Sequence, residues 1–362
     1  TMEADRVRRV VGSVRLAFQP YSIHSIAVAG DVVAVTVAPV ALDFLKTRAT
    51  LCLSCSIEDH MATDPTHIYV FSLVPTAVTG ASLDSDTPPV ASVVVEDAFF
   101  VMHHMNAKYV SSKPSALLAS AVSSSSLCHG CILSFSLQCA NLRHSTTIIF
   151  DRFSLVLRYD VVAQTVTLDY CSYSSMEGLL GDHVLGDMSD ITSPRTRNAM
   201  KQQCDDYLRV TVDIAAGKVV SRTAFPLQDE HGTAYTFELG SVNPSYWGKD
   251  YCYAYGLSFH VHGSPRLEDM GIIKIDLCAA GTADSPSVAG VFAQEGVYVG
   301  EPIFVPDTTE GAAEDDGCVL VVTRFQDIST LVVLDGTTMA QVASVQAPFP
   351  FMFEFHGQWL PD

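Results

Sequence analysis

The sequence predicts an all-β protein, because short apolar runs alternate with turn residues along most of the chain. The runs are rich in Val, Ile, Phe and Tyr, and Gly, Asp, Pro and Thr separate them. Long stretches with the 3.6-residue period of an amphipathic helix are scarce. At 362 residues, the chain is long enough for one large β architecture with a sizeable core.

A weak motif recurs along the chain, in which an apolar run ending in Asp or Ser precedes a turn and another strand. Successive copies are 88, 53, 63 and 59 residues apart. The last three intervals are close to one four-stranded propeller blade, which takes about 40 to 50 residues or more. The spacing favours a β-propeller, and a β-sandwich whose hairpins share turn chemistry stays open as an alternative. The motif residues are Ser72, Asp160, Asp213, Asp276 and Asp335.

The composition indicates a globular chain, and its negative net charge disfavours binding to polyanions. Hydrophobic residues make up 48% and charged residues 17%, and the mean hydropathy is +0.25. The net charge of −19 argues against nucleic acid or an anionic membrane as an electrostatic partner. Apolar contact with lipid needs no positive charge and is compatible with this composition. The longest stretch without Asp, Glu, Lys or Arg, 114–142, is too rich in serine to predict a transmembrane span.

The ten cysteines are irregularly spaced, and no N-glycosylation sequon with a permitted middle residue occurs. Both features suit free thiols in a reducing compartment. Two CxxC pairs, Cys52–Cys55 and Cys128–Cys131, could in principle form a zinc site. The pairs lie much farther apart than in zinc ribbons, so free thiols are the favoured interpretation.

Three of the twelve histidines stand in apolar, strand-like segments: His24 in YSIHSIAV, His103 in FFVMHHMNA, and His356 in FMFEFHG. A single histidine in such a place is usually a core residue with a hydrogen-bond partner. Three of them near strand ends allow another interpretation, because a propeller gathers strand ends around its axis. There they could meet around a metal ion. His103 and His104 are adjacent, so on a strand only one of them can face a given cavity.

Several blocks carry a resemblance to a known family. FELGSVNP, WGKDYCYAYGLSF, GEPIFVP, AEDDGCVLVV and FHG occur in this order, and YSIHSIAV and DAFFVMHHMNA precede them. In these blocks the chain resembles the carotenoid cleavage oxygenase family, which includes the retinal-forming carotene oxygenases and the retinoid isomerohydrolase. The similarity runs in patches from about Tyr21 to Leu360 and is weak across 110–206.

The resemblance implies a seven-bladed propeller that holds a ferrous ion on its axis with four histidines. The family's first histidine lies in an HPHxD-like motif, which this chain does not contain. We therefore expect one domain over residues 1–362, truncated at its N-terminus and incomplete, with about five blades. Residues 110–126 are expected to form a serine-rich inserted loop.

By the same resemblance, His24, His103 and His356 match three iron ligands. His103 is preferred to His104 because it stands three residues before the Asn of the family's Asn-Ala motif, and His104 should turn away to pack or hydrogen-bond.

Glu238 of FELG and Glu301 of GEPIFVP match family glutamates that accept a hydrogen bond from the ligand imidazoles. The resemblance assigns Glu238 to His103 and Glu301 to His356. Such a carboxylate fixes the tautomer of the ring and makes the metal-bound nitrogen more basic.

The implied function is oxidative cleavage of a C=C bond in a carotenoid or apocarotenoid, with Fe2+ as cofactor and O2 as co-substrate. Phe100, Tyr253 and Phe351 are candidate lining of a substrate tunnel, and the acidic loop TTEGAAEDDG is expected to be a solvated hairpin turn. Peripheral membrane contact is a further expectation. The alternatives are cleavage of stilbene-type olefins, retinoid isomerohydrolysis, and a non-catalytic chain that binds an apolar ligand.

Overall fold

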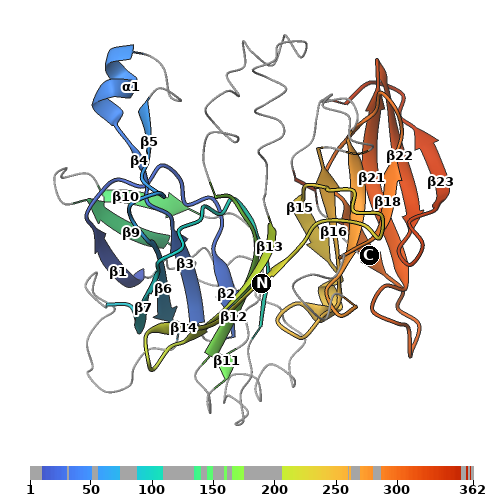
Figure 1. Ribbon diagram of the computed structural model, residues 1–362. Helices are drawn as coiled ribbons and strands as arrows, with labels where there is room; N and C mark the ends of the chain where they lie inside the picture. Colours follow the sequence, from blue (N-terminus) through green and yellow to red (C-terminus); the bar gives the residue numbers. More distant parts are fainter. Residues whose placement is uncertain are drawn as a thin grey trace, which may run out of the picture.

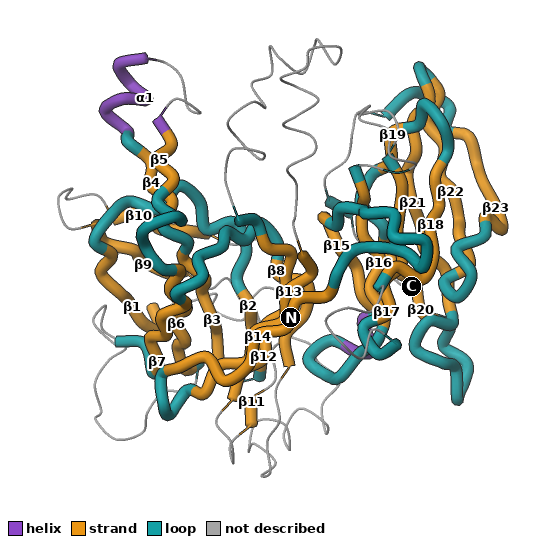
Figure 2. The backbone as a smooth tube through the Cα atoms, in the orientation of Figure 1, coloured by secondary structure: helices purple, strands orange, loops and turns teal. Residues whose placement is uncertain are grey.

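A computed structural model of the chain is built almost entirely from strands (Figures 1 and 2). The all-β prediction is therefore confirmed. The structure describes residues 10–30, 32–50, 56–73, 88–108, 134–139, 145–149, 159–160, 165–174, 206–259, 261, 270–279, 287–351, 356–357 and 359. The CxxC pairs and the serine-rich segment 110–126 lie outside these residues.

The described residues form five larger sheets, which we number by the position of their first strand in the chain. The first contains β1 (Val10–Leu16), β9 (Ser134–Cys139) and β10 (Ser145–Ile149), with β1 parallel to β9. The second has the order β2 (Ala27–Ala29), β3 (Val32–Val37), β6 (Thr66–Ser72), β7 (Ala91–Val95). The third has the order β11 (Tyr159–Asp160), β12 (Thr165–Ser172), β13 (Asp206–Asp213), β14 (Lys218–Phe225), and β8 (His104–Lys108) pairs with β12.

The fourth and fifth sheets form the C-terminal part. The fourth has the order β15 (Glu238–Val242), β16 (Tyr253–Ser258), β17 (Gly271–Asp276), β18 (Val288–Ala293). The fifth has the order β19 (Tyr298–Val299), β21 (Gly317–Phe325), β22 (Ile328–Asp335), β23 (Gln341–Gln346), and β20 (Ile303–Pro306) also pairs with β21. A small ribbon of β4 (Val40–Leu42) and β5 (Ile57–Asp59) carries the helix α1 (Phe44–Thr50), and the 3-10 helix η3 covers Pro244–Tyr246.

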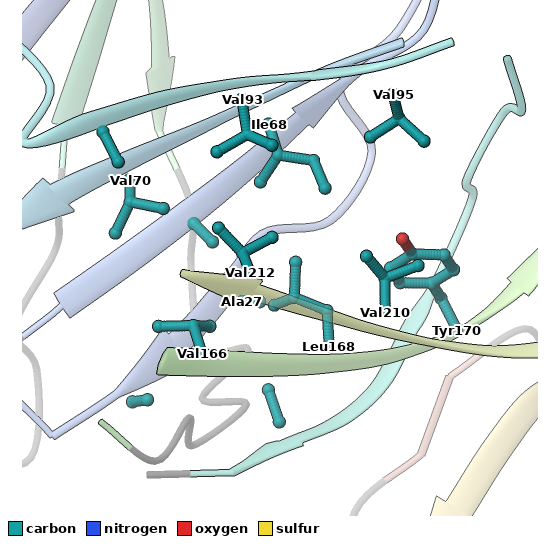
Figure 3. Packing of buried hydrophobic residues seen from close by; sticks show 14 of the residues in the cluster. Ala27, Ile68, Val70, Val93, Val95, Val166, Leu168, Tyr170, Val210 and Val212 are labelled. Atoms are coloured by element: carbon teal, nitrogen blue, oxygen red, sulfur yellow. The ribbon is translucent and has the colours of Figure 1, made fainter. Parts of the chain in front are cut away.

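Consecutive sheets pack face to face through four apolar clusters. Leu16 of the first sheet packs with Val33 and Val35 of the second. Between the second and third sheets, Ile68 and Val93 lie in one cluster with Leu168 and Val210, as Figure 3 shows. Further clusters join the third sheet to the fourth and the fourth to the fifth. Removal of this apolar surface from water is the main favourable term, at roughly 25 cal/mol per Å2.

Phe237, which directly precedes β15, packs between the fourth sheet and the third, and its ring centroid lies 5.3 Å from that of Tyr207 on β13. Its fully buried ring lies over the backbone of β16, where a Cβ on Gly256 would come within 2.5 Å of the ring. Only glycine leaves room for the ring at this position. The same packing places the next residue, Glu238, at the joint between the two sheets.

The Asp/Ser motif marks an equivalent place in four sheets. Ser72, Asp213, Asp276 and Asp335 each end the third strand of their sheet, and a turn follows each of the three aspartates. The aspartates accept backbone N–H groups of that turn, as in the 2.8 Å bond from Thr338 N to Asp335 Oδ1. Asp160 ends β11, the first strand of the third sheet, so it lies at a different place in its sheet from the other four residues.

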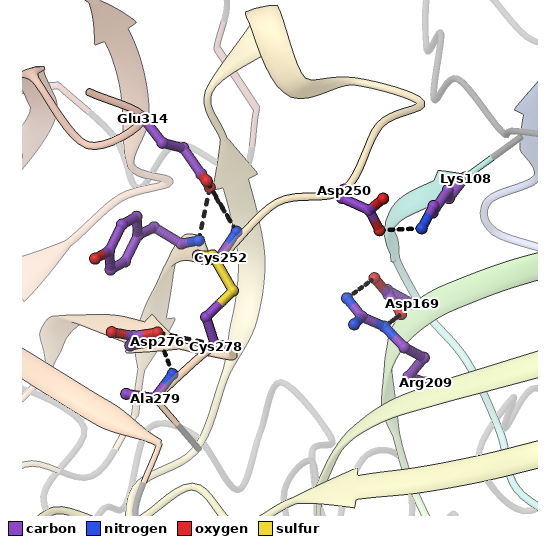
Figure 4. The surroundings of a disulfide bond; sticks show 10 residues. Lys108, Asp169, Arg209, Asp250, Cys252, Asp276, Cys278, Ala279 and Glu314 are labelled. Atoms are coloured by element: carbon purple, nitrogen blue, oxygen red, sulfur yellow. Dashed lines mark hydrogen bonds and ion pairs between the residues drawn. A yellow bond between two sulfur atoms is a disulfide. The ribbon is translucent and has the colours of Figure 1, made fainter. Parts of the chain in front are cut away.

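The expectation of free thiols is wrong for part of the chain. Cys252 and Cys278 form a disulfide (Figure 4). It lies at one end of the β16–β17 pair, where Leu277 N donates to Cys252 O. Cys318 is free, as expected. The strands bring two cysteines together that lie 26 residues apart in sequence, and spacing alone did not indicate this pair.

The acidic loop joins the antiparallel strands β20 and β21, and its residues 308–311 are exposed, as expected for a solvated hairpin turn. Glu314 and Asp315 depart from that expectation, because they contact the fourth sheet. Glu314 accepts hydrogen bonds from the backbone N–H groups of Cys252 and Tyr253 at 2.8 and 2.7 Å (Figure 4). Asp315 lies 2.6 Å from the ammonium group of Lys274, which is only 3% exposed. The loop therefore fastens the fifth sheet to the fourth, because a buried lysine needs a paired carboxylate.

Among the described residues, no helix has the length and apolarity that crossing a membrane requires.

A polar network lies at the joint between the third and fourth sheets. Arg209 on β13 makes two hydrogen bonds to Asp169 on β12, at 2.7 and 2.8 Å. Tyr251, which precedes β16, donates to the same carboxylate at 2.6 Å. The Asp169 side chain is only 3% exposed, so its charge depends on these partners.

We expect the substitution Asp169→Asn to lower the free energy of unfolding by about 3 to 5 kcal/mol, because it leaves the Arg209 guanidinium without its counter-charge. The control is Asp97→Asn. Asp97 pairs with Arg222 at 3.0 Å but its side chain is 87% exposed, so the loss there should stay below about 1 kcal/mol. Urea denaturation of both variants measures the difference, and equal effects would contradict the role given to Asp169.

Candidate metal centre

The three histidines singled out in the sequence lie on segments far apart along the chain. His24 precedes β2, His103 immediately precedes β8, and His356 follows the fifth sheet. The structure brings them together, with one ring nitrogen from each lying within 4.8 Å of the others. The ring centroid of His103 lies 4.9 Å from that of His24 and 5.4 Å from that of His356.

Glu238 holds the ring of His103. Its Oε2 lies 2.6 Å from His103 Nδ1, and it also accepts the Leu239 N–H at 3.0 Å and the hydroxyl of Tyr173. Burial would lower the pKa of His103, but the charge of Glu238 and the hydrogen bond to it raise that pKa overall. Burial would also raise the pKa of Glu238, yet His103 and the other donors keep it below its usual value. Glu238 is therefore an ionised acceptor.

Glu301 has the corresponding position beside His356. Its Oε1 lies 3.4 Å from His356 Nδ1, and its Oε2 accepts the Gly357 N–H at 2.7 Å. Burial raises the pKa of Glu301, while Gly357 N–H and His356 oppose the shift. A Cβ on Gly357 would come within 2.8 Å of Ile303 Cδ1, so glycine permits this close approach.

The third ring, His24, is kept neutral by its surroundings. Burial lowers its pKa, and the neighbouring His103 and His356 lower it further, against a smaller opposite effect of Glu238. A neutral imidazole has one nitrogen with a free lone pair, which is the form that binds a metal ion.

The buried nitrogen of His103 shows that these residues fit a metal. His103 Nε2 is inaccessible to solvent and has no hydrogen-bond partner among the described residues. Because Nδ1 carries the proton donated to Glu238, Nε2 presents a lone pair toward the other two rings. A buried polar atom without a partner is costly, and a metal ion would satisfy it. Imidazole nitrogens suit first-row ions such as Fe2+.

His104 has a different environment from its neighbour. Its Nδ1 lies 2.6 Å from Ser25 Oγ, its Nε2 lies 3.2 Å from Thr36 Oγ1, and its backbone N–H donates to the same serine. Burial, with the nearby His103, lowers the pKa of His104 to about 3, so this ring is neutral. His104 therefore links β8 to the segment that carries His24. It can do so because adjacent side chains on a strand point in opposite directions, so His104 points away from the cluster.

The contacts of the candidate tunnel residues are with other aromatic rings and with a lysine. Phe100 is fully buried and its ring lies 6.3 Å from that of Tyr173. Tyr253 lies under the ammonium group of Lys274, 4.3 Å away, at the end of β16 opposite to the residue that pairs with Glu238. The ring of Phe351 is 5.1 Å from that of Phe349. Their assignment to a tunnel stays a prediction.

The sequence did not indicate Tyr173 as part of the site. It follows β12 in the segment LDYCSYSS, which carries no motif, and its position beside Glu238 depends on the pairing of Tyr173 with Phe100. Both backbone hydrogen bonds of that pair are made, at 2.9 and 3.0 Å. Tyr173 thus links the carboxylate to the segment that leads to His103.

Comparison with known proteins assigns the chain to a family. The model of the retinal pigment epithelial membrane protein family matches residues 3–361, and the chain belongs to this family. A carotenoid cleavage dioxygenase 8 homolog of Oryza sativa is 32% identical over 136 residues, which is 37% of this chain and 22% of that protein. The mouse β,β-carotene 15,15'-dioxygenase is 29% identical over 157 residues, or 40% of this chain and 25% of that protein.

The solved structures agree in fold. The cobalt-substituted ACO of Synechocystis superposes with a TM-score of 0.57 at 20% identity, covering 92% of this chain and 52% of that one. An ACO/RPE65 chimera gives a TM-score of 0.56 at 19% identity, with the same coverage. The propeller of the carotenoid oxygenase type is thereby confirmed, while the number of blades stays a prediction. The chain spans about half the length of these structures and a smaller part of the curated relatives.

We expect Tyr173→Phe to lower the free energy of unfolding by about 1 to 3 kcal/mol, because the buried Glu238 loses a hydrogen-bond donor. Tyr170 supplies a matched control on the same strand segment. Its hydroxyl is buried and has no hydrogen-bond partner in the described part of the chain, so Tyr170→Phe should be neutral or stabilising. Chemical denaturation of the two variants is the measurement, and an equal loss in both would show that Tyr173 does not support Glu238.

Proposed function

We propose that the protein is a non-haem iron(II) dioxygenase that cleaves a C=C bond of a carotenoid or apocarotenoid into aldehyde or ketone products. The observation that carries the proposal is the cluster of His24, His103 and His356, with Glu238 and Glu301 on the Nδ1 side of two rings. The names of the relatives from rice and mouse support the substrate class.

His24, His103 and His356 would hold the ion through imidazole nitrogens. A ferrous ion bound there supplies the redox chemistry with dioxygen that cleavage of a double bond needs. The ligand set carries no negative charge of its own, and Glu238 and Glu301 compensate the charge of the metal from behind the rings.

Hydrogen bonds from the polypeptide would keep the three imidazole rings in place during the reaction. Glu238 holds the proton on His103 Nδ1, and Tyr173 and Leu239 N–H hold Glu238. His104 holds the His24 segment through Ser25. Because His24 and His356 are exposed, dioxygen and a long apolar substrate can approach from their side. To place one double bond of the substrate at the metal, the site must hold its residues to within a fraction of an ångström.

The helix α1 supports contact with a lipid surface, from which an apolar polyene would be taken. Its residues Phe44 and Leu45 are 49% and 80% exposed, and Lys46 and Arg48 follow them. Figure 1 shows α1 standing away from the sheets on the β4–β5 ribbon. Exposed apolar side chains beside basic ones are typical of segments that lie in a membrane interface.

The experiment uses the polypeptide encoded by the complete transcript, loaded with Fe2+ and supplied with β-carotene, an apocarotenal or a stilbene under O2. We expect aldehyde products from a carotenoid or apocarotenoid with equivalent O2 uptake, and a loss of at least about 100-fold in His103→Ala and His356→Ala. His67→Ala is the control, because this ring stacks on Tyr69 at 5.9 Å and lies outside the cluster.

The other outcomes separate the alternatives. If only the stilbene is cleaved, the proposed substrate class is wrong, while the proposed oxidative cleavage of a C=C bond still holds. Isomerisation of a retinoid ester without O2 uptake would indicate an isomerohydrolase. Polyene binding with neither iron nor O2 uptake would overturn the enzymatic proposal in favour of an apolar-ligand binder.

We also expect Glu238→Gln to weaken Fe2+ or Co2+ binding by about 10- to 100-fold, because the amide no longer fixes the tautomer of His103. Glu301→Gln should have a smaller effect, since its contact with His356 is 3.4 Å against 2.6 Å for Glu238 and His103. Glu58→Gln, near the exposed His60, is the control. Metal titration by calorimetry measures all three, and unchanged affinity in Glu238→Gln would contradict the role of this carboxylate.

A further inference from the structure

Leu239 has an unusual backbone conformation. Its φ is 49°, in the left-handed region that residues with a side chain rarely adopt. Two other non-glycine residues of the described chain have a positive φ, Gln326 and Met339, and both lie in connections between strands. Leu239 instead lies inside β15, directly after the carboxylate that holds His103. Strained backbone of this kind persists only where the surrounding structure enforces it.

The pairing of β15 with β16 shows a β-bulge at the same place. From Glu238 to Ser241, β15 advances three residues. Their partners on β16, Leu257 and Tyr255, are only two residues apart. One residue of β15 is therefore extra, and such a bulge changes the direction in which the side chains around it point.

The packing of its neighbours identifies Glu238 as the extra residue. In a regular strand, side chains two positions apart point to the same face. Here Phe237 lies in the apolar cluster that includes the third sheet, whereas Leu239 lies in the cluster with the fifth sheet. With regular alternation Glu238 would point into the second cluster, where a carboxylate has apolar neighbours. The bulge instead leaves it in contact with His103.

Regular alternation of the two faces returns after Leu239. A Cβ on Gly240 would collide with Met105 Sδ on β8 of the third sheet, so only glycine allows β15 to lie this close to β8. The next residue, Ser241, faces the fifth sheet, where its Oγ accepts the N–H of Phe304 at 3.1 Å. The irregularity is thus confined to Glu238 and Leu239.

We propose that Leu239 is a positioning residue of the metal centre, because its left-handed backbone creates the bulge that turns Glu238 away from the fifth sheet and toward His103. This inference rests on the proposed function, since it concerns the same site. The Leu239 N–H donates at 3.0 Å to Glu238 Oε2, the oxygen that lies 2.6 Å from His103 Nδ1. The Leu239 side chain, only 6% exposed, anchors this conformation in the cluster with the fifth sheet.

The experiment exchanges Leu239 for residues that differ in how well they tolerate a positive φ. Isoleucine is an isomer of leucine, but its branched Cβ disfavours the left-handed region. Glycine adopts this region freely and lacks the buried side chain. Leu334→Ile is the matched control, because it makes the same exchange at a fully buried position of the same cluster, in the extended strand β22.

All variants are made in the product of the complete transcript, and calorimetric titration gives their affinity for Co2+. We expect Leu239→Ile to weaken binding by about 10-fold or more, as when the carboxylate behind a ligand ring is lost. Leu239→Gly should keep the affinity within about 3-fold although its Tm falls, because the cavity costs stability while the bulge is retained. Leu334→Ile should leave the affinity unchanged.

The crystal structure of metal-free Leu239→Ile gives a readout that needs no metal. We expect a negative φ at this position, with Glu238 Oε2 more than about 3.5 Å from His103 Nδ1 and so beyond hydrogen-bond reach. If the parent protein binds no Co2+, the proposed metal centre is wrong, and the distance between these two atoms alone decides whether Leu239 positions the carboxylate.

Three results would overturn the proposal. The first is a Leu239→Ile variant in which the contact between Glu238 and His103 is unchanged, which would show that the rest of the sheet positions the carboxylate. The second is an equal loss of affinity in Leu334→Ile, which would assign the effect to packing of the whole cluster. The third is a loss in Leu239→Gly as large as in Leu239→Ile, which would assign it to the buried side chain.

Discussion

The contact between Glu238 and His103 is the interaction on which the site depends. It joins β15 of the fourth sheet to the segment before β8 of the third, at 2.6 Å. Glu238 is only 5% exposed, so its charge must be met by donors, and His103, Leu239 N–H and Tyr173 supply them. Since the proton of His103 stays on Nδ1, the lone pair stays on Nε2 and faces His24 and His356. One buried carboxylate thus determines which nitrogen is offered to a metal.

Charged pairs recur at the joints between sheets. Asp169 and Arg209 lie where Tyr251 brings the fourth sheet to the third, and Lys274 and Asp315 lie where the fifth meets the fourth. Apolar faces alone tolerate small displacements of one sheet over another. Because separating a buried charge from its partner is costly, these pairs disfavour such displacements. The three histidines lie on segments next to different sheets, so each charged pair that fixes one sheet against the next also stabilises the distances between the histidines.

The pair His103–His104 shows how two chemically identical neighbours acquire different roles. The first faces the cluster with a buried nitrogen that has no partner among the described residues, and the second has both ring nitrogens near hydroxyl oxygens of Ser25 and Thr36. Ser25 is also next to His24 in the chain. His104 therefore stabilises the position of another ring of the cluster without facing it.

The sequence by itself determined the all-β class, the turn motif at Asp213, Asp276 and Asp335, and the histidines and glutamates of the candidate site. These are properties of local pattern, or of motifs short enough to recognise in one segment. Tertiary structure alone decided the partner of Cys252, the burial of Asp315 against Lys274, and the place of Tyr173 behind Glu238. Each of these joins residues 26 to 65 positions apart. Their proximity follows from strand register and from the packing of one sheet on the next, which no local pattern encodes.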